Sequence, residues 1–173
     1  HHQGDPVGGE GAVTGVAARP MTRVRVVGAS GAGKSHLARE LSVALEIPRF
    51  DLDRMFMDPG WVPVSDETAE QRIAQALAEA EAWVLDGNWS GWAAPAWDAA
   101  DAIVWVDLPT PVALWQLLRR TVGRIVAREE VWPGSGCYET WGKAFASRES
   151  ILLYSARSAG KFRRRYSAEF ARL

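Results

Sequence analysis

The sequence predicts an α/β fold, in which a parallel β-sheet is flanked by helices. Short apolar runs alternate along the chain with segments of helical period. The run Ala102–Leu108 (AIVWVDL) is apolar on both faces, which is typical of parallel strands covered on both sides. A glycine-rich turn, Gly28–Ser35, stands between the first such run and the first helical segment. These three observations define the class, and each element follows from a local pattern.

Four segments are expected to form strands. The first, Thr22–Gly28 (TRVRVVG), is β-branched and stops at a glycine. The others are Arg49–Leu52, Trp83–Asp86 and Ala102–Leu108. Between the second and the third, Met55–Pro63 (MFMDPGWVP) contains a Pro-Gly turn and is expected to be a loop.

Four helices are expected between and after these strands. The first has Leu37, Leu41, Ala44 and Leu45 on one face and is ended by Pro48. Capping residues mark later starts, because serine or threonine followed by acidic residues or proline is a typical helix beginning. The expected starts are Lys34, Ser65, Thr110 and Ser147. The segment Glu130–Lys143, rich in glycine and aromatic residues, is expected to be a loop or short lid.

Composition and charge limit the kind of protein. The 173 residues and the hydrophobic share of 47% fit one domain, which we place at residues 21–173, with a disordered leader or tag remnant at 1–20. A net charge of −1 argues against direct nucleic-acid binding. The single cysteine, Cys137, fits a reducing compartment, the cytoplasm. No apolar run approaches the roughly 20 residues that span a bilayer, so we expect no membrane partner.

The glycine-rich turn matches G-x-x-x-x-G-K-[ST] at every fixed position, as Gly28-Ala29-Ser30-Gly31-Ala32-Gly33-Lys34-Ser35. Small residues let successive backbone N–H groups surround a phosphate, and the following helix directs its positive end at the same anion. The Lys34 ammonium is expected to reach the β- and γ-phosphates of ATP, and the Ser35 hydroxyl to ligate Mg²⁺. The residues predicted to bind the nucleotide are Gly28, Ser30, Gly31, Ala32, Gly33, Lys34, Ser35 and Arg120.

A second acidic position is expected opposite this loop. Trp83–Asp86 (WVLD) is an apolar strand that ends in a carboxylate, the form of a Walker B position. Asp86 would hold the hydration shell of Mg²⁺ or orient the acceptor. The alternative is an ordinary surface aspartate at a strand-to-loop turn.

Two further carboxylates, Asp51 and Asp53, follow the second strand, at the edge where α/β sheets bind ligands. If the backbone is extended, their spacing of two points both side chains the same way. One would accept the proton of a substrate hydroxyl, and the other would touch Mg²⁺ or a sugar hydroxyl. In the alternative interpretation one of them only caps a turn, and we favour Asp53 for function.

Arginines near the end of the third helical segment, which begins at Thr110, are candidates for charge neutralisation. Arg120 and Arg124 are four residues apart and share a helix face. Phosphoryl transfer builds charge that arginine neutralises with paired hydrogen bonds. A solvated basic helix end, which complements the helix dipole, is the competing interpretation.

The order of these motifs resembles that of small adenylate-kinase-related P-loop kinases, especially the DNA topology modulation (FlaR-like) group. Besides the P-loop, the matching stretches are Phe50–Asp53, Pro59–Trp61, Val84–Asn88, Val106–Pro109 and Arg119–Thr121. The resemblance implies a nucleoside-monophosphate-kinase-like sheet of strand order 2-3-1-4-5, an acceptor pocket and an arginine-bearing lid, here around residues 119–143. The sequence shows no fifth strand after the last helix, which leaves a truncation of this chain open.

The predicted acceptor site contains Asp51, Asp53, Trp61, Asn88 and Trp89. Trp61 and Trp89 flank the implied pocket, where an indole can stack on a base or sugar ring. The leading hypothesis is therefore an ATP- and Mg²⁺-dependent kinase with Lys34, Asp53, Asp86, Arg120 and Arg124 as catalytic residues. Its acceptor would be a nucleotide or nucleoside-like small molecule. The alternatives are a non-catalytic ATP-binding regulator linked to DNA topology and, more weakly, a GTPase, for which an Asn-Lys-x-Asp motif is missing.

Overall fold

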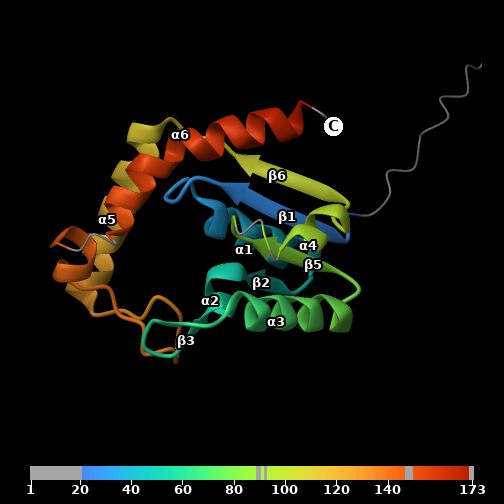
Figure 1. Cartoon of the computed structure of the whole chain (residues 1–173), viewed down its shortest axis with the longest axis horizontal. Helices are drawn as coiled ribbons and strands as arrows, with labels where there is room; N and C mark the ends of the chain where they lie inside the picture. The colour runs from blue at the N-terminus through green and yellow to red at the C-terminus, as the bar shows by residue number, and fades with distance from the viewer. Residues whose placement is uncertain (1–20, 89–90, 92, 147–149, 172–173) are drawn as a thin grey trace, which may run out of the picture.

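The computed structural model describes residues 21–88, 91, 93–146 and 150–171. The expected leader at 1–20 and the predicted acceptor residue Trp89 lie outside the described residues. Within the described part, strands and helices alternate along the chain from β1 to β6 (Figure 1).

The main sheet is parallel throughout and has four strands. These are β1 (Arg23–Gly28), β2 (Arg49–Asp51), β5 (Trp83–Asp86) and β6 (Ala102–Val106), in the spatial order β2-β5-β1-β6. Numbered by their order along the chain, the four strands stand 2-3-1-4, as expected. Because all four point the same way, their carboxyl ends share one edge, and the register places Asp51 beside Asp86 and Asp86 beside Val26. Within the described residues no fifth strand joins this four-stranded sheet, because the chain after β6 is helical or irregular there.

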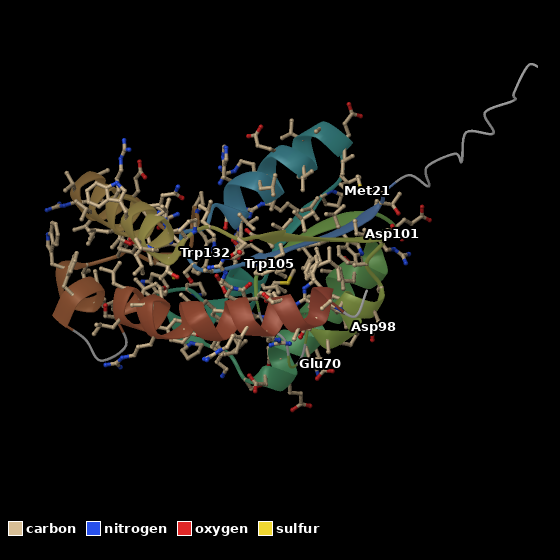
Figure 2. All side chains as sticks on the ribbon, turned by 90° about the horizontal axis from the view of Figure 1, so that it is seen from above. Met21, Glu70, Asp98, Asp101, Trp105 and Trp132 are labelled. Carbon is tan, nitrogen blue, oxygen red and sulfur yellow. The ribbon has the colours of Figure 1, made fainter. Side chains whose placement is uncertain are left out.

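Helices cover both faces of this sheet, so the fold is the expected α/β class. Helix α1 (Lys34–Leu45) packs on Val24, Val26 and Val84 through its buried Ala38. On the opposite face, Trp83 and Leu85 meet buried residues of α3 (Asp66–Glu79) and α4 (Ala94–Asp98). Figure 2 shows the sheet edge-on, with α1 on one side and α6 on the other.

Two long helices close the fold beyond the sheet. Helix α5 (Thr110–Ala127) buries Ala113, Leu117 and Thr121 along one stripe. Helix α6 (Ile151–Phe170) buries the small residues Ser155 and Ala159 in its first half and Tyr166 in its second. The small residues let α6 lie close to α5, while Tyr166 extends under the sheet. Figure 1 shows the two helices side by side at one end and α6 continuing across β1 and β6.

The expected loop at Met55–Pro63 is wrong, because the segment contains regular elements. Helix α2 (Leu52–Phe56) starts directly after β2, and β3 (Met57–Asp58) pairs antiparallel with β4 (Val62–Pro63). The Pro-Gly turn lies at the tip of this hairpin, with Gly60 and Trp61 both at positive φ. The strands are only two residues long, and the backbone of Gly60 also donates to Ser135 of a distant segment. A hydrogen bond between residues so far apart in sequence cannot be recognised from the local sequence pattern.

Several expected boundaries shift by a few residues. β2 ends at Asp51 instead of Leu52, because the Asp51 side chain caps α2. β6 ends at Val106 instead of Leu108. Pro109 takes the N-cap position of α5, so Thr110 is the first helical residue instead of the cap.

The segment Glu130–Lys143 is mostly irregular, in agreement with the expected loop or short lid. Glu130 and Tyr138 form an isolated antiparallel bridge, and a π-helix, η1, spans Gly142–Ala146. The cap of α6 is Ser150, whose hydroxyl accepts from the Leu153 N–H, while the expected start at Ser147 lies outside the described residues. Among the described helices, none combines the length and apolar character that crossing a bilayer requires.

The cap of α3 gives a direct test of this fold. The Ser65 hydroxyl accepts a hydrogen bond from the Thr68 N–H at 3.2 Å, as its sequence position predicts. We expect Ser65→Ala to lower the free energy of unfolding by about 1 kcal/mol in urea titrations, because a helix N–H loses its partner. Ser65→Asp, which keeps a capping oxygen, should unfold near the wild-type midpoint. Equal stability of Ser65→Ala and wild type would contradict this role.

Candidate functional site

The turn between β1 and α1 has the backbone of an anion-binding loop. Gly28 and Gly31 lie at φ values of 147° and 80°, which side chains rarely adopt. A Cβ on Gly28 would collide with the Val106 carbonyl, and one on Gly31 with the Ala113 carbonyl. The glycines therefore let the loop lie directly against β6 and α5.

The same turn presents free hydrogen-bond donors. Gly33 occupies the N-cap of α1 in a left-handed conformation and makes no side-chain cap. The first N–H groups of the helix are thus left for a ligand, and the helix dipole favours an anion there. The predicted nucleotide-binding residues from Gly28 to Ser35 form this one continuous structure.

Lys34, the first residue of α1, folds back over the turn. Its Nζ donates to the Ala29 carbonyl at 2.9 Å. Desolvation lowers the pKa of this ammonium, while the negative charges of Asp53 and Asp86 oppose that shift. The positive charge of Arg120 adds to the lowering of the Lys34 pKa. The Lys34 charge therefore lies within electrostatic reach of the residues predicted to surround the transferred phosphoryl group.

Asp86 ends β5 at the floor of the site, where it is 2% exposed. Burial raises the pKa of its carboxyl, and a hydrogen bond from the Ser35 side chain and the charges of Lys34 and Arg49 lower it. Arg49 Nη1 lies 2.9 Å from Asp86 Oδ2. The structure thus brings together Ser35 and Asp86, the two residues predicted to act at the metal.

These two oxygen donors fit Mg²⁺, which prefers hard ligands and in nucleotide sites takes one or two protein ligands besides phosphate and water. No cluster of three or more histidine, cysteine or acidic side chains able to hold a metal occurs in the part of the chain described. A Mg²⁺ site at Ser35 and Asp86 does not need such a cluster.

Asp51 and Asp53 do not share one direction, because the backbone between them turns from strand into helix. Asp51 caps α2, with its Oδ1 accepting from the N–H groups of Asp53 at 3.0 Å and Arg54 at 3.2 Å. The expectation that both carboxylates point alike is therefore wrong, and the capping alternative describes Asp51. Asp53 lies in the first turn of α2 and is exposed, with its charge acting on Lys34 and Arg120.

The two predicted arginines occupy different surroundings on α5. Desolvation and then the charge of Arg124 lower the pKa of Arg120, while Glu139, Asp53 and Asp86 raise it. Arg120 is exposed, and its charge lies within electrostatic reach of Asp53 and Asp86. Arg124 Nη1 is 3.6 Å from Glu139 Oε1, so it joins the end of α5 to the segment that follows.

Asn88, predicted to bind the acceptor, contacts the start of the glycine-rich turn Gly28–Ser35, which we call the phosphate loop. Its Oδ1 accepts from the Gly28 N–H at 3.0 Å, and its Nδ2 donates to the Gly28 carbonyl. Tyr166 of α6 donates its hydroxyl to the same Oδ1 at 3.1 Å. The amide thus fastens the end of β5 to the start of the phosphate loop, and α6 supports it from behind.

Trp61 forms part of a junction between two segments that are far apart in sequence. Its backbone N–H donates to Cys137 Sγ at 3.3 Å and its indole Nε1 to the Tyr138 carbonyl at 2.9 Å. Its ring lies 5.6 Å from that of Trp132, tilted by 56°. We call residues 129–140 the docked segment, because these contacts hold it against the β3–β4 hairpin (Figure 1).

Sequence reasoning missed three residues of this site: Arg49, Trp132 and Tyr166. Arg49 had a usable signal, because it lies two residues before Asp51 on one strand and so shares its face. Trp132 and Tyr166 reach the site from 81 and 78 residues away along the chain. Nothing local marks such contacts.

Comparison with known proteins adds a similarity of fold. No family model matches the chain, and no curated protein matches it either. Among solved structures it is similar to a gluconokinase from Sinorhizobium meliloti 1021, with 16% identity and a TM-score of 0.47. The match covers 81% of this chain and 75% of that one.

The role of Asn88 can be tested through nucleotide affinity. Asn88→Ala removes both contacts to the Gly28 backbone, so the loop should lose its fixed starting point. We expect the dissociation constant for Mg²⁺-ATP, measured by titration calorimetry, to rise about tenfold to a hundredfold, because two hydrogen bonds contribute about 1–3 kcal/mol. Tyr166→Phe keeps both Gly28 contacts and should change it much less. If Asn88→Ala bound Mg²⁺-ATP with wild-type affinity, the role of Asn88 in fixing the loop would be contradicted.

Tyr166 gives a pH-dependent test of the support from α6. Burial raises the pKa of its phenol to about 12, from an ordinary value near 10. A raised folded-state pKa means that its stabilisation is complete below about pH 10 and is lost as the pH rises toward 12. The stability difference between wild type and Tyr166→Phe, from chemical denaturation, should therefore shrink above pH 10. A difference that stays constant to pH 11.5 would show that Tyr166 ionises normally.

Proposed function

We propose that the chain is an ATP-dependent phosphotransferase that moves the γ-phosphoryl group of Mg²⁺-ATP to a small-molecule acceptor. The observation that carries this proposal is the convergence of Lys34, Arg120 and the Ser35–Asp86 pair at the carboxyl edge of one parallel sheet. The charge of Asp53 acts on both Lys34 and Arg120. Cations, a metal-binding pair and a carboxylate that can accept a proton are the parts that phosphoryl transfer requires.

The phosphate end of the nucleotide would lie on the loop from Gly28 to Ser35. Its backbone N–H groups and the start of α1 bind the anion, and Lys34 would exchange its contact with the Ala29 carbonyl for a phosphate oxygen. Ser35 and Asp86 would hold Mg²⁺. When bound, Mg²⁺-ATP supplies the group to be transferred and a cation that neutralises its charge.

The acceptor would approach from α2. Asp53 would accept the proton of the acceptor hydroxyl as the hydroxyl oxygen bonds to the γ-phosphorus and the bond to the ADP oxygen breaks. Asp51 would act mainly by holding α2. Trp61, Asn88 and Trp89 would complete the acceptor site, for a nucleotide or nucleoside-like compound.

Arg120 and Arg124 would neutralise the equatorial oxygens in the transition state. They lie on α5, at the beginning of the proposed lid at residues 119–143. The salt bridge from Arg124 to Glu139 means that closure and arginine placement would be linked.

We also propose a family group and a cellular location for the chain. The motif order favours the adenylate-kinase-related group that includes the DNA topology modulation (FlaR-like) proteins. The chain would act in the cytoplasm as a single domain, since a lone buried cysteine fits a reducing compartment.

The proposal is tested by following ADP release. Purified protein with Mg²⁺-ATP is offered nucleoside monophosphates, nucleosides and small hydroxylated metabolites in separate reactions. We expect one class to stimulate ADP release, and Lys34→Ala to reduce that stimulated rate at least about a hundredfold, because a phosphate-binding charge is lost. The circular dichroism spectrum of Lys34→Ala should match that of wild type.

Two outcomes would contradict this function. Full activity in Lys34→Ala would exclude the mechanism as written. Tight ATP binding without stimulation by any acceptor class would instead support a non-catalytic regulatory role.

A further inference from the structure

Trp132 makes a contact for which the proposed chemistry has no stated use. Its indole Nε1 donates to Asp51 Oδ2 at 3.1 Å. The other oxygen of the same carboxylate caps α2, accepting from the N–H groups of Asp53 and Arg54. One side chain of the docked segment therefore bonds the residue that starts the helix carrying Asp53.

From these contacts we infer that Trp132 is a positioning residue, which couples docking of residues 129–140 to the placement of Asp53. The inference rests on the proposed function for its catalytic consequence. Trp132 acts through Asp51, because its indole donates to that carboxylate and Asp53 is the next residue but one. No contact between Trp132 and the acceptor is needed.

The docked segment is built to present this indole in one orientation. The Glu130 carboxylate accepts from the backbone N–H groups of Gly134 and Gly136, which closes the turn after Trp132. The Val131 N–H donates to the Cys137 carbonyl at 2.8 Å. Trp132 is thus held at the edge of a tight turn, and its ring rests against Trp61.

The contact also reaches the predicted metal pair. Arg49 Nη1 lies 2.9 Å from Asp86 Oδ2 and 3.7 Å from Asp51 Oδ2. The oxygen that receives the Trp132 indole is therefore the one nearest Arg49. Loss of the indole donor would leave Arg49 as the nearest charged partner of that oxygen.

The docked segment begins two residues after α5 ends, so its position is tied to Arg120 and Arg124 as well. Arg124 pairs with Glu139 inside the segment. When the segment docks, α5 and α2 are joined across the site by Glu139 on one side and Trp132 on the other. The Trp132 contact would thus place Asp53 only when the arginine side is also in position.

Trp132→Phe tests this inference, because it keeps an aromatic ring against Trp61 and removes only the N–H donor. With the acceptor class found to stimulate ADP release, we expect kcat/KM for that acceptor to fall about tenfold or more. The KM for ATP should change less than about twofold, because the phosphate loop is untouched. Trp115→Phe is the matched control, since Trp115 is 64% exposed on α5 and outside the site.

A double-mutant cycle with Asp51→Asn separates positioning from general destabilisation. Asparagine is also a good N-cap, so the start of α2 is preserved while the charged acceptor of the indole is lost. If Trp132 acts through Asp51, Trp132→Phe should have little further effect in the Asp51→Asn protein. An equal loss in both backgrounds would overturn the inference.

A measurement without any acceptor distinguishes failure of this inference from failure of the proposed function. In wild type the backbone amides of Asp53 and Arg54 should exchange hydrogen slowly, and in Trp132→Phe about tenfold faster, with Trp115→Phe unchanged. The Trp132 indole N–H resonance, identified by its loss in Trp132→Phe, should shift in Asp51→Asn. Unchanged exchange together with an unshifted resonance would overturn the coupling, whether or not the chain is a kinase.

Discussion

The buried carboxylate of Asp86 is the constraint on which the candidate site depends. A charge at the end of a central strand, 2% exposed, costs free energy unless it has partners. The Ser35 hydroxyl, the Lys34 ammonium and the Arg49 guanidinium are those partners; the first two come from the start of α1 and the third from β2. A stable fold therefore requires that the phosphate loop and β2 meet at Asp86. The arrangement that satisfies this charge is the one that phosphate and a divalent cation would use.

The layer behind the sheet holds the phosphate loop in place. Arg25, at the centre of β1, is also 2% exposed, and desolvation lowers the pKa of its guanidinium. Its Nη1 donates to the Ala93 carbonyl at 3.1 Å, and its charge lies 5.2 Å from the Trp97 ring centre. Trp97 in turn stacks on Tyr166, whose hydroxyl bonds Asn88. Packing on one face of the sheet thus fixes the hydrogen bond between Tyr166 and Asn88 at the carboxyl edge of the sheet.

Between the β3–β4 hairpin and the docked segment, contacts between residues far apart in sequence take the place of a large core. The β3–β4 hairpin and the docked segment are short and contain few buried residues. They are held by main-chain bonds such as Gly60 to Ser135, by the Trp61 and Trp132 rings, and by the buried Cys137. Regions of this construction open at lower cost than a central sheet does. The hairpin and the docked segment are thus the part of the fold that would open at the lowest cost.

The sequence by itself determined the layered α/β class and the glycine-rich loop, because these depend on local patterns, whereas the strand order was expected only from the resemblance to P-loop kinases. Periodicity, glycine spacing and a carboxylate after an apolar strand act within a few residues. The predicted direction of Asp51 and Asp53 failed because a cap turned the chain into α2. Only the tertiary structure decided that Asn88 grips Gly28 and that Trp132 reaches Asp51. Those bonds join residues 60 and 81 positions apart, and their partners are selected by packing of the whole chain and not by any neighbouring residue.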